Sequence, residues 1–428
     1  MKAMQLKTLT AACALALAGV SGQALALGPG VTPDVQLFIS GSSAQQKSLG
    51  ALFGSFCKSG TLDTYFDNGG GKQFRAYFCT FDGANPRVPA SLAGKNVLIH
   101  NRAKGGSAFG VLPVARAQAI DSMQVSAANC TSTGAATWSC DISAGKLVPR
   151  VPDGGVSDVE PAMFVGPNVP PGGTPVTGTD LANLTVGSEL AVVFGVVVSN
   201  NTPVSNLSRS QVASIFNGTY KDWHQVDPAI AAGTPIQVCR RVPGSGTQAG
   251  AQVFFLNNPC STTGSLRFVS SADTDPASGY TVSELPSTGD LLTCVNNAAA
   301  AGKMAIGISG IEKQPGPTDA YKYVSIDGIA PTVQDAATGK YDYWFEQAIQ
   351  WRSTTVGGIP APSGAQLDLL NLIKSASGDP AVITSAGIDG VAALPTNGFA
   401  PTIPFTATNP VMQGSRFSNS CQAPRLFF

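Results

Sequence analysis

Charged residues are scarce in this chain, and neither sign prevails. Lys and Arg number 26 and Asp and Glu also number 26, which together make only 12% of the 428 residues. Proteins that bind nucleic acid normally carry a basic excess, so we expect no nucleic-acid partner. Beyond its N-terminal region the sequence also lacks an unbroken apolar stretch long enough to span a bilayer.

Histidine and the common catalytic motifs are nearly absent. The only histidines are His100 and His224, and no C-x-x-C, G-x-S-x-G or G-x-x-x-x-G-K-[ST] sequence occurs. Zinc, redox and P-loop chemistry therefore have no support, and we expect neither a metal nor another cofactor. We predict no catalytic residue, although residues far apart in the sequence can still converge into a hydrolytic site.

The first 26 residues have the pattern of an export signal. Lys2 and Lys7 precede an apolar run over residues 9–20, and an Ala-Leu-Ala sequence ends at Ala26. The apolar run is too short to remain as a membrane span. We therefore predict cleavage near Ala26 and a periplasmic or secreted mature chain. A lipoprotein box at Cys13 is the alternative, but the Leu expected before that cysteine is missing.

Eight cysteines remain once Cys13 is removed, and an even number suits disulfides in an exported protein. Cys130 and Cys140 flank a short loop and are predicted to pair with each other. Cys57 and Cys79 also lie near each other in the sequence. The remaining four allow three pairings, which the sequence leaves open: Cys239, Cys260, Cys294 and Cys421.

Short apolar runs that end in glycine turns predict an α/β fold. Residues 36–40 run into Gly41 in this way, and residues 96–100 lead to the glycines at 105 and 106. Residues 191–199 are almost wholly apolar, as in a strand that is covered on both faces. We further predict helices over residues 343–352 and 365–374. Residues 126–140 and 164–182 are predicted to be loop-like insertions.

Residues 241–247, with the sequence Arg-Val-Pro-Gly-Ser-Gly-Thr, lie between a predicted strand and a predicted helix. The glycines let backbone N–H groups converge, and the start of the helix adds the positive end of its dipole. Ser245 and Thr247 offer hydroxyl groups, and Arg241 offers a planar fork that suits two oxygens of one anion. The alternative is a glycine-rich turn whose Ser and Thr only cap the helix.

This stretch resembles the R-x-x-G-S-G-T signature of the periplasmic phosphate-binding proteins of ABC importers. Upstream, residues 215–223 (IFNGTYKDW) are similar to the I-F-x-G-x-x-x-x-W segment of that family, and residues 227–230 to its D-P-A-I. Weaker similarity extends to other segments in the same order, namely ISGSSA at 39–44, GGS at 105–107, VSD at 156–158 and MAIGI at 304–308.

The resemblance implies a two-lobed α/β fold of the type II periplasmic binding protein kind. Each lobe would hold a mixed sheet flanked by helices, and the ligand would lie in the cleft between the lobes. We place the first lobe at residues 27–192 together with 318–428, and the second lobe at residues 193–317. The expected ligand is a tetrahedral oxyanion, with phosphate as the first choice.

The resemblance also carries ligand-binding roles over to residues of this chain. In the second lobe these residues are Arg241, Ser245, Gly246 and Thr247. In the first lobe Ser107 corresponds to the family's serine at a helix N-terminus. Ser42 and Ser43 both lie in the matching glycine turn, and the sequence does not decide between them.

Asp158 corresponds to the family's aspartate, which accepts a hydrogen bond from the proton on phosphate. Phosphate keeps a proton near neutral pH and sulfate does not, so a buried carboxylate at this position would discriminate between them. The alternative is a surface-turn aspartate that follows Gly154 and Gly155.

The chain departs from the family at Pro243, where many members carry an aspartate that steadies the arginine. Arg102 and Lys104 could add positive field to the cleft, but we favour a solvated face for both. We expect a monomer that delivers its ligand to an ABC permease in the inner membrane. The alternatives are a protein for another oxyanion, a secreted or surface phosphate scavenger or adhesin, and a phosphatase-like hydrolase.

Overall fold

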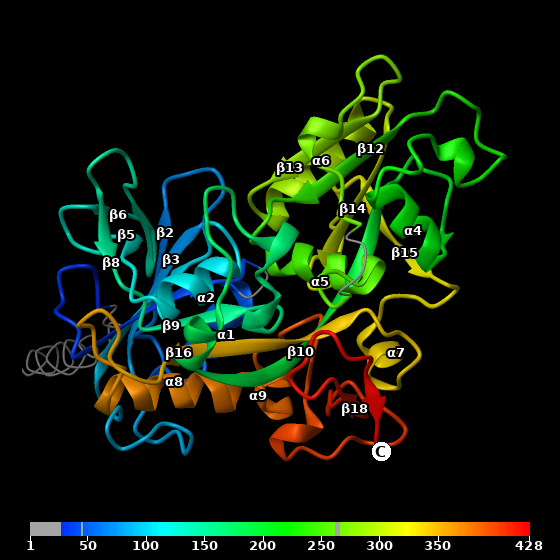
Figure 1. Cartoon of the computed structure of the whole chain (residues 1–428). Helices are drawn as coiled ribbons and strands as arrows, with labels where there is room; N and C mark the ends of the chain where they lie inside the picture. The colour runs from blue at the N-terminus through cyan, green and yellow to red at the C-terminus, as the bar shows by residue number, and fades with distance from the viewer. Residues whose placement is uncertain (1–26, 44–45, 262–265) are drawn as a thin grey trace, which may run out of the picture.

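The computed structural model describes residues 27–43, 46–261 and 266–428 (Figure 1). The predicted signal peptide and Cys13 lie outside the described residues. Within the described ranges, no helix is both long and apolar enough to cross a membrane.

Two lobes share one continuous mixed sheet, which runs through the long strand β10 (Leu184–Ser199). In the first lobe the order of the neighbouring strands is β16-β9-β1-β4-β3-β2-β7-β6. Their bounds are β1 (Val35–Gly41), β2 (Asp63–Asp67), β3 (Phe74–Thr80), β4 (Asn96–Arg102), β6 (Cys130–Gly134), β7 (Thr137–Cys140), β9 (Gly154–Ser157) and β16 (Trp344–Arg352). Strand β1 is parallel to β4 and β9, whereas β16 runs antiparallel to β9 and β10.

The sheet of the second lobe has the order β13-β12-β14-β10, and β15 also pairs with β10. The strands are β11 (Asn206–Leu207), β12 (Ile236–Arg241), β13 (Thr281–Leu285), β14 (Met304–Gly310) and β15 (Tyr321–Ile326). Strand β12 is parallel to β13 and β14, and β10 is antiparallel to β14 and β15. Both lobes are therefore α/β with mixed sheets, as expected.

Strand β10 joins the lobes because its two halves have different partners. The half from Leu184 to Val193 pairs with β16, and the half from Phe194 to Val198 pairs with β14. Figure 1 shows β10 and β16 running from one lobe to the other. Residues 190–199 are all buried, which explains why the sequence here is apolar on both faces of the strand.

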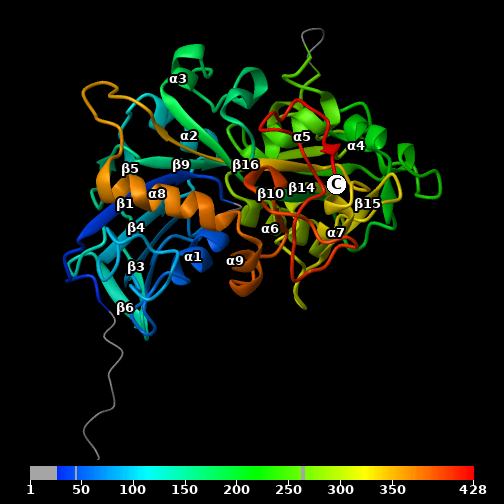
Figure 2. The ribbon, with the colours of Figure 1, turned by 90° about the horizontal axis from the view of Figure 1, so that it is seen from below.

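Helices cover both faces of each half of the sheet. In the first lobe α2 packs on one face, and α1 and α8 pack on the other, where Figure 2 shows α8 lying across the strands. In the second lobe α4 and α5 cover the face of Val196 and Val198, and α6 covers the face of Val197. The first-lobe helices are α1 (Gln46–Gly54), α2 (Ala108–Ala115), α3 (Gly178–Ala182), α8 (Gly364–Ser377) and α9 (Pro380–Ser385). Those of the second lobe are α4 (Arg209–Phe216), α5 (Gly246–Leu256) and α6 (Thr288–Ala300), with α7 (Val333–Ala337) following β15.

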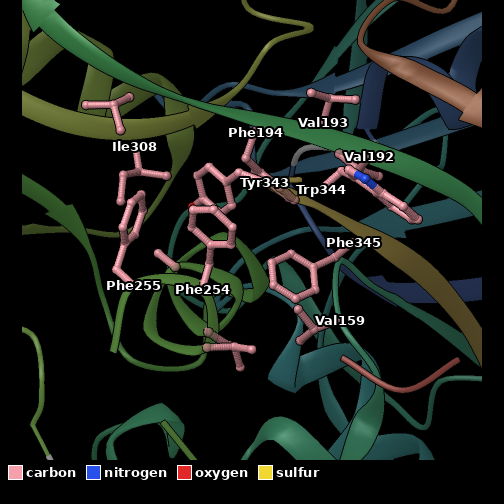
Figure 3. Close-up of a cluster of buried hydrophobic side chains, with 14 of the residues drawn as sticks. Val159, Val192, Val193, Phe194, Phe254, Phe255, Ile308, Tyr343, Trp344 and Phe345 are labelled. Carbon is pink, nitrogen blue, oxygen red and sulfur yellow. The ribbon is translucent and has the colours of Figure 1, made fainter. Parts of the chain in front are cut away.

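An aromatic cluster fastens α5 to the strands that connect the lobes (Figure 3). The rings of Phe254 and Tyr343 are stacked with centroids 4.5 Å apart, and Phe255 meets the same tyrosine edge-on at 5.1 Å. Phe194 of β10 lies 5.7 Å from the Tyr343 ring. Ring pairs of this kind stabilise a core by about 0.5–1.5 kcal/mol beyond their buried area. The junction between the lobes is thus part of the main core.

Three sequence predictions of local structure are wrong, at least in part. The segment 164–182 is not a loop throughout, because its last five residues form α3. The segment 343–352 is not a helix, because Trp344–Arg352 forms strand β16, in which all residues are buried. The segment 126–140 is not a plain loop, because β6 and β7 form a hairpin within it. The helix predicted over 365–374 is confirmed as part of α8. The predicted lobe limits, 27–192 with 318–428 and 193–317, stay predictions.

The disulfides include both predicted pairs, Cys57–Cys79 and Cys130–Cys140. The pairing that the sequence left open is Cys239–Cys294 and Cys260–Cys421. The first of these lies within the second lobe and joins β12 to α6. The second joins the region after α5 to the C-terminal tail.

The tail, residues 414–428, is fixed to the strands between the lobes. The carboxylate of Glu346 on β16 accepts hydrogen bonds from Ser415 Oγ at 2.5 Å, from the Arg416 backbone N at 2.7 Å and from the Ser418 backbone N at 2.7 Å. Two hydrogen bonds join Ser420 to Glu160. The Ser420 backbone N–H donates to Glu160 Oε1 at 3.0 Å, and the Glu160 backbone N–H donates to Ser420 Oγ at 3.1 Å. Three short strands, β17 (Val391–Ala393), β18 (Gly414–Ser415) and β19 (Arg425–Leu426), complete the C-terminal region.

Replacing both Cys260 and Cys421 by Ser should lower the free energy of unfolding by about 2–5 kcal/mol. The two cysteines are 161 residues apart in the sequence, so their disulfide closes a long loop in the unfolded chain. The matched change at Cys130 and Cys140, which are only 10 residues apart, should cost less. Urea unfolding of both variants measures the difference. Equal losses would contradict the argument from loop length.

Glu189 on β10 is a buried carboxyl group whose ionisation should depend on folding. Its side chain accepts a hydrogen bond from Ser377 Oγ at 3.0 Å. Burial raises its pKa from 4.5 to about 8, and the Ser377 bond and the charge of Lys374 offset only part of that effect. The folded protein therefore holds a proton on Glu189 over a pH range in which the unfolded chain has lost it.

The stability of the wild type should accordingly fall as the pH rises from about 4.5 to about 8, because in this window the unfolded chain releases the Glu189 proton and the folded protein keeps it. Glu189→Gln keeps an acceptor for Ser377 and cannot ionise, so its stability should fall less over the same window. Urea unfolding at several pH values measures both proteins. Parallel curves would show that Glu189 does not titrate with folding.

Candidate functional site

The residues predicted to bind an anion lie where strands of both lobes end. Ser42 follows β1, Ser107 precedes α2, and Asp158 follows β9 in the first lobe. Arg241 is the last residue of β12 in the second lobe, and α5 begins five residues later with Gly246. The carboxyl ends of parallel strands and the starts of the following helices thus meet at the boundary between the lobes, the usual place for ligands in α/β proteins.

Asp158 is the centre of the network at this boundary and is only 2% exposed. One carboxylate oxygen accepts a hydrogen bond from Ser42 Oγ, and the other accepts one from Thr247 Oγ1 at 3.1 Å. Its backbone N–H donates to Ser107 Oγ at 3.3 Å. The surface-turn alternative for Asp158 is therefore wrong, because its side chain is bonded to both lobes in the interior.

The two glycine turns are in contact across the boundary. The backbone N–H of Ala108, at the start of α2, donates to the carbonyl oxygen of Gly244 at 2.9 Å. A Cβ atom on Gly246 would lie 2.3 Å from Ser107 Oγ and 2.8 Å from the Asp158 Cβ. A Cβ atom on Gly106, whose φ is +77°, would lie 2.9 Å from the Ser245 Cα. The close approach of the lobes thus requires glycine at both positions.

Ser245 has the capping role that the sequence offered as an alternative. Its Oγ accepts a hydrogen bond from the Gln248 backbone N–H at 3.3 Å at the start of α5. A hydroxyl group that accepts one hydrogen bond can still donate another, so capping does not use up the donor of Ser245. The hydroxyl of Thr247 has a different role, because it donates to Asp158.

The guanidinium of Arg241 is buried and held from several sides. Nη1 donates to Ser43 Oγ of the first lobe at 3.2 Å and to Thr288 Oγ1 at 2.9 Å. Nε donates to the carbonyl oxygen of Leu285 at 3.3 Å, and Nη2 donates to that of Pro286 at 2.9 Å. Sequence reasoning did not find the last three partners. The Ser287-x-x-Asp290 sequence signals the start of α6, but nothing in it signals a contact with Arg241.

Burial shifts the pKa values of the two central charged groups in opposite directions. It lowers the pKa of Arg241 to about 10, against the opposing effects of the charges of Asp158 and Asp290, so the guanidinium stays protonated at neutral pH. It raises the pKa of Asp158, while the hydrogen bonds from Ser42 and Thr247 and the charge of Arg241 act to lower it. The site therefore contains a cation and a carboxyl group that is easier to protonate than usual.

The prediction that Arg102 lies on a solvent-exposed face is wrong. Arg102 is 4% exposed and forms an ion pair with Asp121. Lys104 has the expected exposure, with half of its side chain accessible, and pairs with the same aspartate at 2.8 Å. Because both cations share Asp121, its carboxylate offsets one of their two positive charges.

The structure therefore brings all the predicted ligand-binding residues into one connected group, and their binding roles stay predictions. Ser42, Ser43, Ser107 and Asp158 come from the first lobe, and Arg241, Ser245, Gly246 and Thr247 come from the second.

Comparison with known families gives one match within the chain. Residues 190–348 match the model of a PBP superfamily domain. This region contains β10 from Leu190 onward, all the other strands of the second lobe and the first part of β16. The match agrees with the resemblance inferred from the sequence, and it covers less than half of the chain. No curated protein matches the chain.

Among solved structures, the chain is similar to a putative phosphate ABC transporter substrate-binding protein with bound phosphate from Clostridium perfringens. The identity is 14% and the TM-score 0.49, over 83% of this chain and 99% of that one. It is also similar to an ABC-type phosphate transport receptor from Vibrio cholerae, with 16% identity and a TM-score of 0.43 over 82% and 98% of the two chains. Both likenesses are distant.

Gly246→Ala should lower the free energy of unfolding by about 1–3 kcal/mol, because the added methyl group overlaps Ser107 and Asp158. Gly289→Ala is the matched control, since Gly289 lies in the first turn of α6 with its nearest neighbour at 3.6 Å. The control should be neutral or slightly stabilising. Urea unfolding without added anions compares the two, and equal stabilities would show that the lobes do not pack closely at Gly246.

Proposed function

We propose that this chain, whose residues 190–348 match a PBP superfamily domain, is an exported solute-binding protein that holds a tetrahedral oxyanion, phosphate above all, between its two lobes. One observation carries the proposal. The buried carboxylate of Asp158 is bonded to Ser42 of one lobe and Thr247 of the other, beside the guanidinium of Arg241. Polar groups from separate segments converge here at the starts of two helices.

The chemistry of these groups suits an oxyanion. Hydroxyl groups, the N–H groups at the starts of α2 and α5, and a guanidinium are all hydrogen-bond donors directed at negative charge in such sites. Asp158 supplies the one strong acceptor. An anion that still carries a proton could donate to it, whereas a fully ionised anion would be repelled. This difference supports phosphate over sulfate as the ligand.

Capture and release would follow from relative motion of the lobes. Closing would complete hydrogen bonds from both sides and exclude water, and the joint would lie in β10 and β16. Export through the predicted signal peptide would place the protein in the periplasm or outside the cell. An ABC permease in the inner membrane would be the partner that receives the ligand from the monomer.

The site supports binding better than hydrolysis. Both histidines are engaged elsewhere: His100 contacts Gln36 Nε2 at 2.7 Å, and His224 contacts the carbonyl oxygen of Ile230 at 2.7 Å. Asp158 is the one carboxyl group among the predicted ligand-binding residues, and its two hydrogen bonds from hydroxyl groups do not favour a role as general base.

Titration calorimetry of the purified protein should show binding of inorganic phosphate with at least tenfold (about 1.4 kcal/mol) preference over sulfate. Asp158→Asn should reduce that preference, because an amide can donate to sulfate as well as accept from phosphate. Asp153→Asn, which changes an aspartate bonded to the Phe38 backbone N–H, is the control and should keep it. Absence of heat with phosphate, or preference for sulfate, would refute phosphate as the ligand.

A further inference from the structure

The second lobe holds Arg241 through the turn that leads into α6. Strands β12 and β13 are parallel and place Arg241 opposite Leu285, so the chain after β13 passes directly beside the guanidinium. The carbonyl oxygens of Leu285 and Pro286 and the hydroxyl of Thr288 accept three of its hydrogen bonds. Thr288 is itself only 2% exposed.

Among the described residues, all the acceptors of Arg241 are neutral. They are two carbonyl oxygens and the hydroxyls of Ser43 and Thr288, and the aspartate of the related signature is replaced by Pro243. Within the described residues, no carboxylate is hydrogen-bonded to the guanidinium. Asp158 and Asp290 act on it only through their charge. The arginine is therefore fixed in position without being neutralised by a bonded partner.

One N–H group of the Arg241 guanidinium is not used by these hydrogen bonds. A guanidinium has one N–H on Nε and two on each terminal nitrogen. Nη1 donates twice, to Ser43 and Thr288, while Nη2 donates once, to Pro286. The second N–H of Nη2 has no acceptor among the described residues. An arginine that is 2% exposed and retains a free N–H is a donor suited to an anion.

We propose that Thr288 is the positioning residue of Arg241 and replaces the missing carboxylate with a neutral acceptor. The inference rests on the proposed function, since it concerns how the same site binds its anion. A carboxylate partner would fix the arginine and cancel much of its charge. A threonine hydroxyl fixes it and leaves the charge to the ligand. With the neutral turn Leu285–Thr288 as its partner, Arg241 thus contributes more to anion binding than it would beside a carboxylate.

The hydroxyl of Thr288 has a specific place in this arrangement. It shares Nη1 with Ser43, so this one nitrogen is bonded to α6 of the second lobe and to the β1 turn of the first. Loss of the Thr288 acceptor would free the guanidinium to rotate about its remaining bonds. The anion would then have to order the arginine on binding, and its affinity would fall.

Calorimetry with inorganic phosphate tests the inference on four proteins. Thr288→Val keeps the shape and removes the acceptor, and it should bind phosphate about 10- to 100-fold more weakly than the wild type. Thr288→Ser keeps the hydroxyl and should stay within about threefold. The control is Thr293→Val, at an exposed position of the same helix, which should bind like the wild type.

A double-mutant cycle separates positioning from general damage. In an Arg241→Lys background the planar fork is gone, so Thr288→Val should weaken binding by no more than about threefold. A role that is merely structural would cost the same factor in both backgrounds and would overturn the inference. Unchanged affinity of Thr288→Val in the wild-type background would overturn it as well.

Failure of a variant to fold and failure of the wild type to bind phosphate can each be told apart from the outcomes of the cycle. If Thr288→Val does not fold, as judged by thermal unfolding, Thr288→Ala takes its place in the same cycle and is subject to the same criteria. If the wild-type protein itself binds no phosphate, the proposed function fails, and the inference fails with it.

Discussion

The carboxylate of Asp158 is removed from water, and its hydrogen bonds come from both lobes. An uncompensated buried charge costs several kcal/mol, so this one side chain requires donors close by. Ser42 and Thr247 supply them from turns that are far apart in the sequence, and Arg241 adds a positive charge. The glycines at 106 and 246 are needed because the turns must approach within van der Waals contact for those donors to reach.

The strands between the lobes explain why this approach is possible. Strand β10 takes part in the sheets of both lobes, and the aromatic cluster around Tyr343 packs α5 against the same region. Because α5 begins at the site and ends in this cluster, the position of Thr247 depends on the packing of Phe254 and Phe255. A helix anchored by large rings at one end presents its N-terminus in a defined direction at the other.

Local patterns in the sequence predicted much of the fold. The apolar run at 191–199 is the buried part of β10, and the glycine turns after 36–40 and 96–100 carry Ser42 and Ser107. Strand β16 was missed because its apolar residues recur at a spacing that also suits a helix, with Trp344, Phe345, Ala348 and Ile349 as the pattern. A strand that is buried on both faces has no alternation to reveal it.

The composition of the site could be predicted in part, and its contacts could not. The resemblance selected the residues at 42, 43, 107, 158 and 241–247, which the structure brings together. Within the described residues Arg241 is bonded to Ser43, to two backbone carbonyls and to Thr288, which lies 47 residues further along the chain. Carbonyl groups are present at every residue, so no side-chain pattern can identify which of them will face an arginine. Arg102 was misjudged for a related reason, because its partner Asp121 becomes visible only in three dimensions.

The disulfides of the second lobe and the tail overlap along the chain. Cys239 pairs with Cys294, and Cys260 pairs with Cys421, so every peptide bond between Cys239 and Cys421 lies inside at least one covalent ring. A protease that cuts a surface loop in this range leaves two pieces that are still joined. The cut ends stay near each other, and the pieces separate only if a reductant is present as well. A nick there would therefore leave Arg241, α6 and β16 covalently connected.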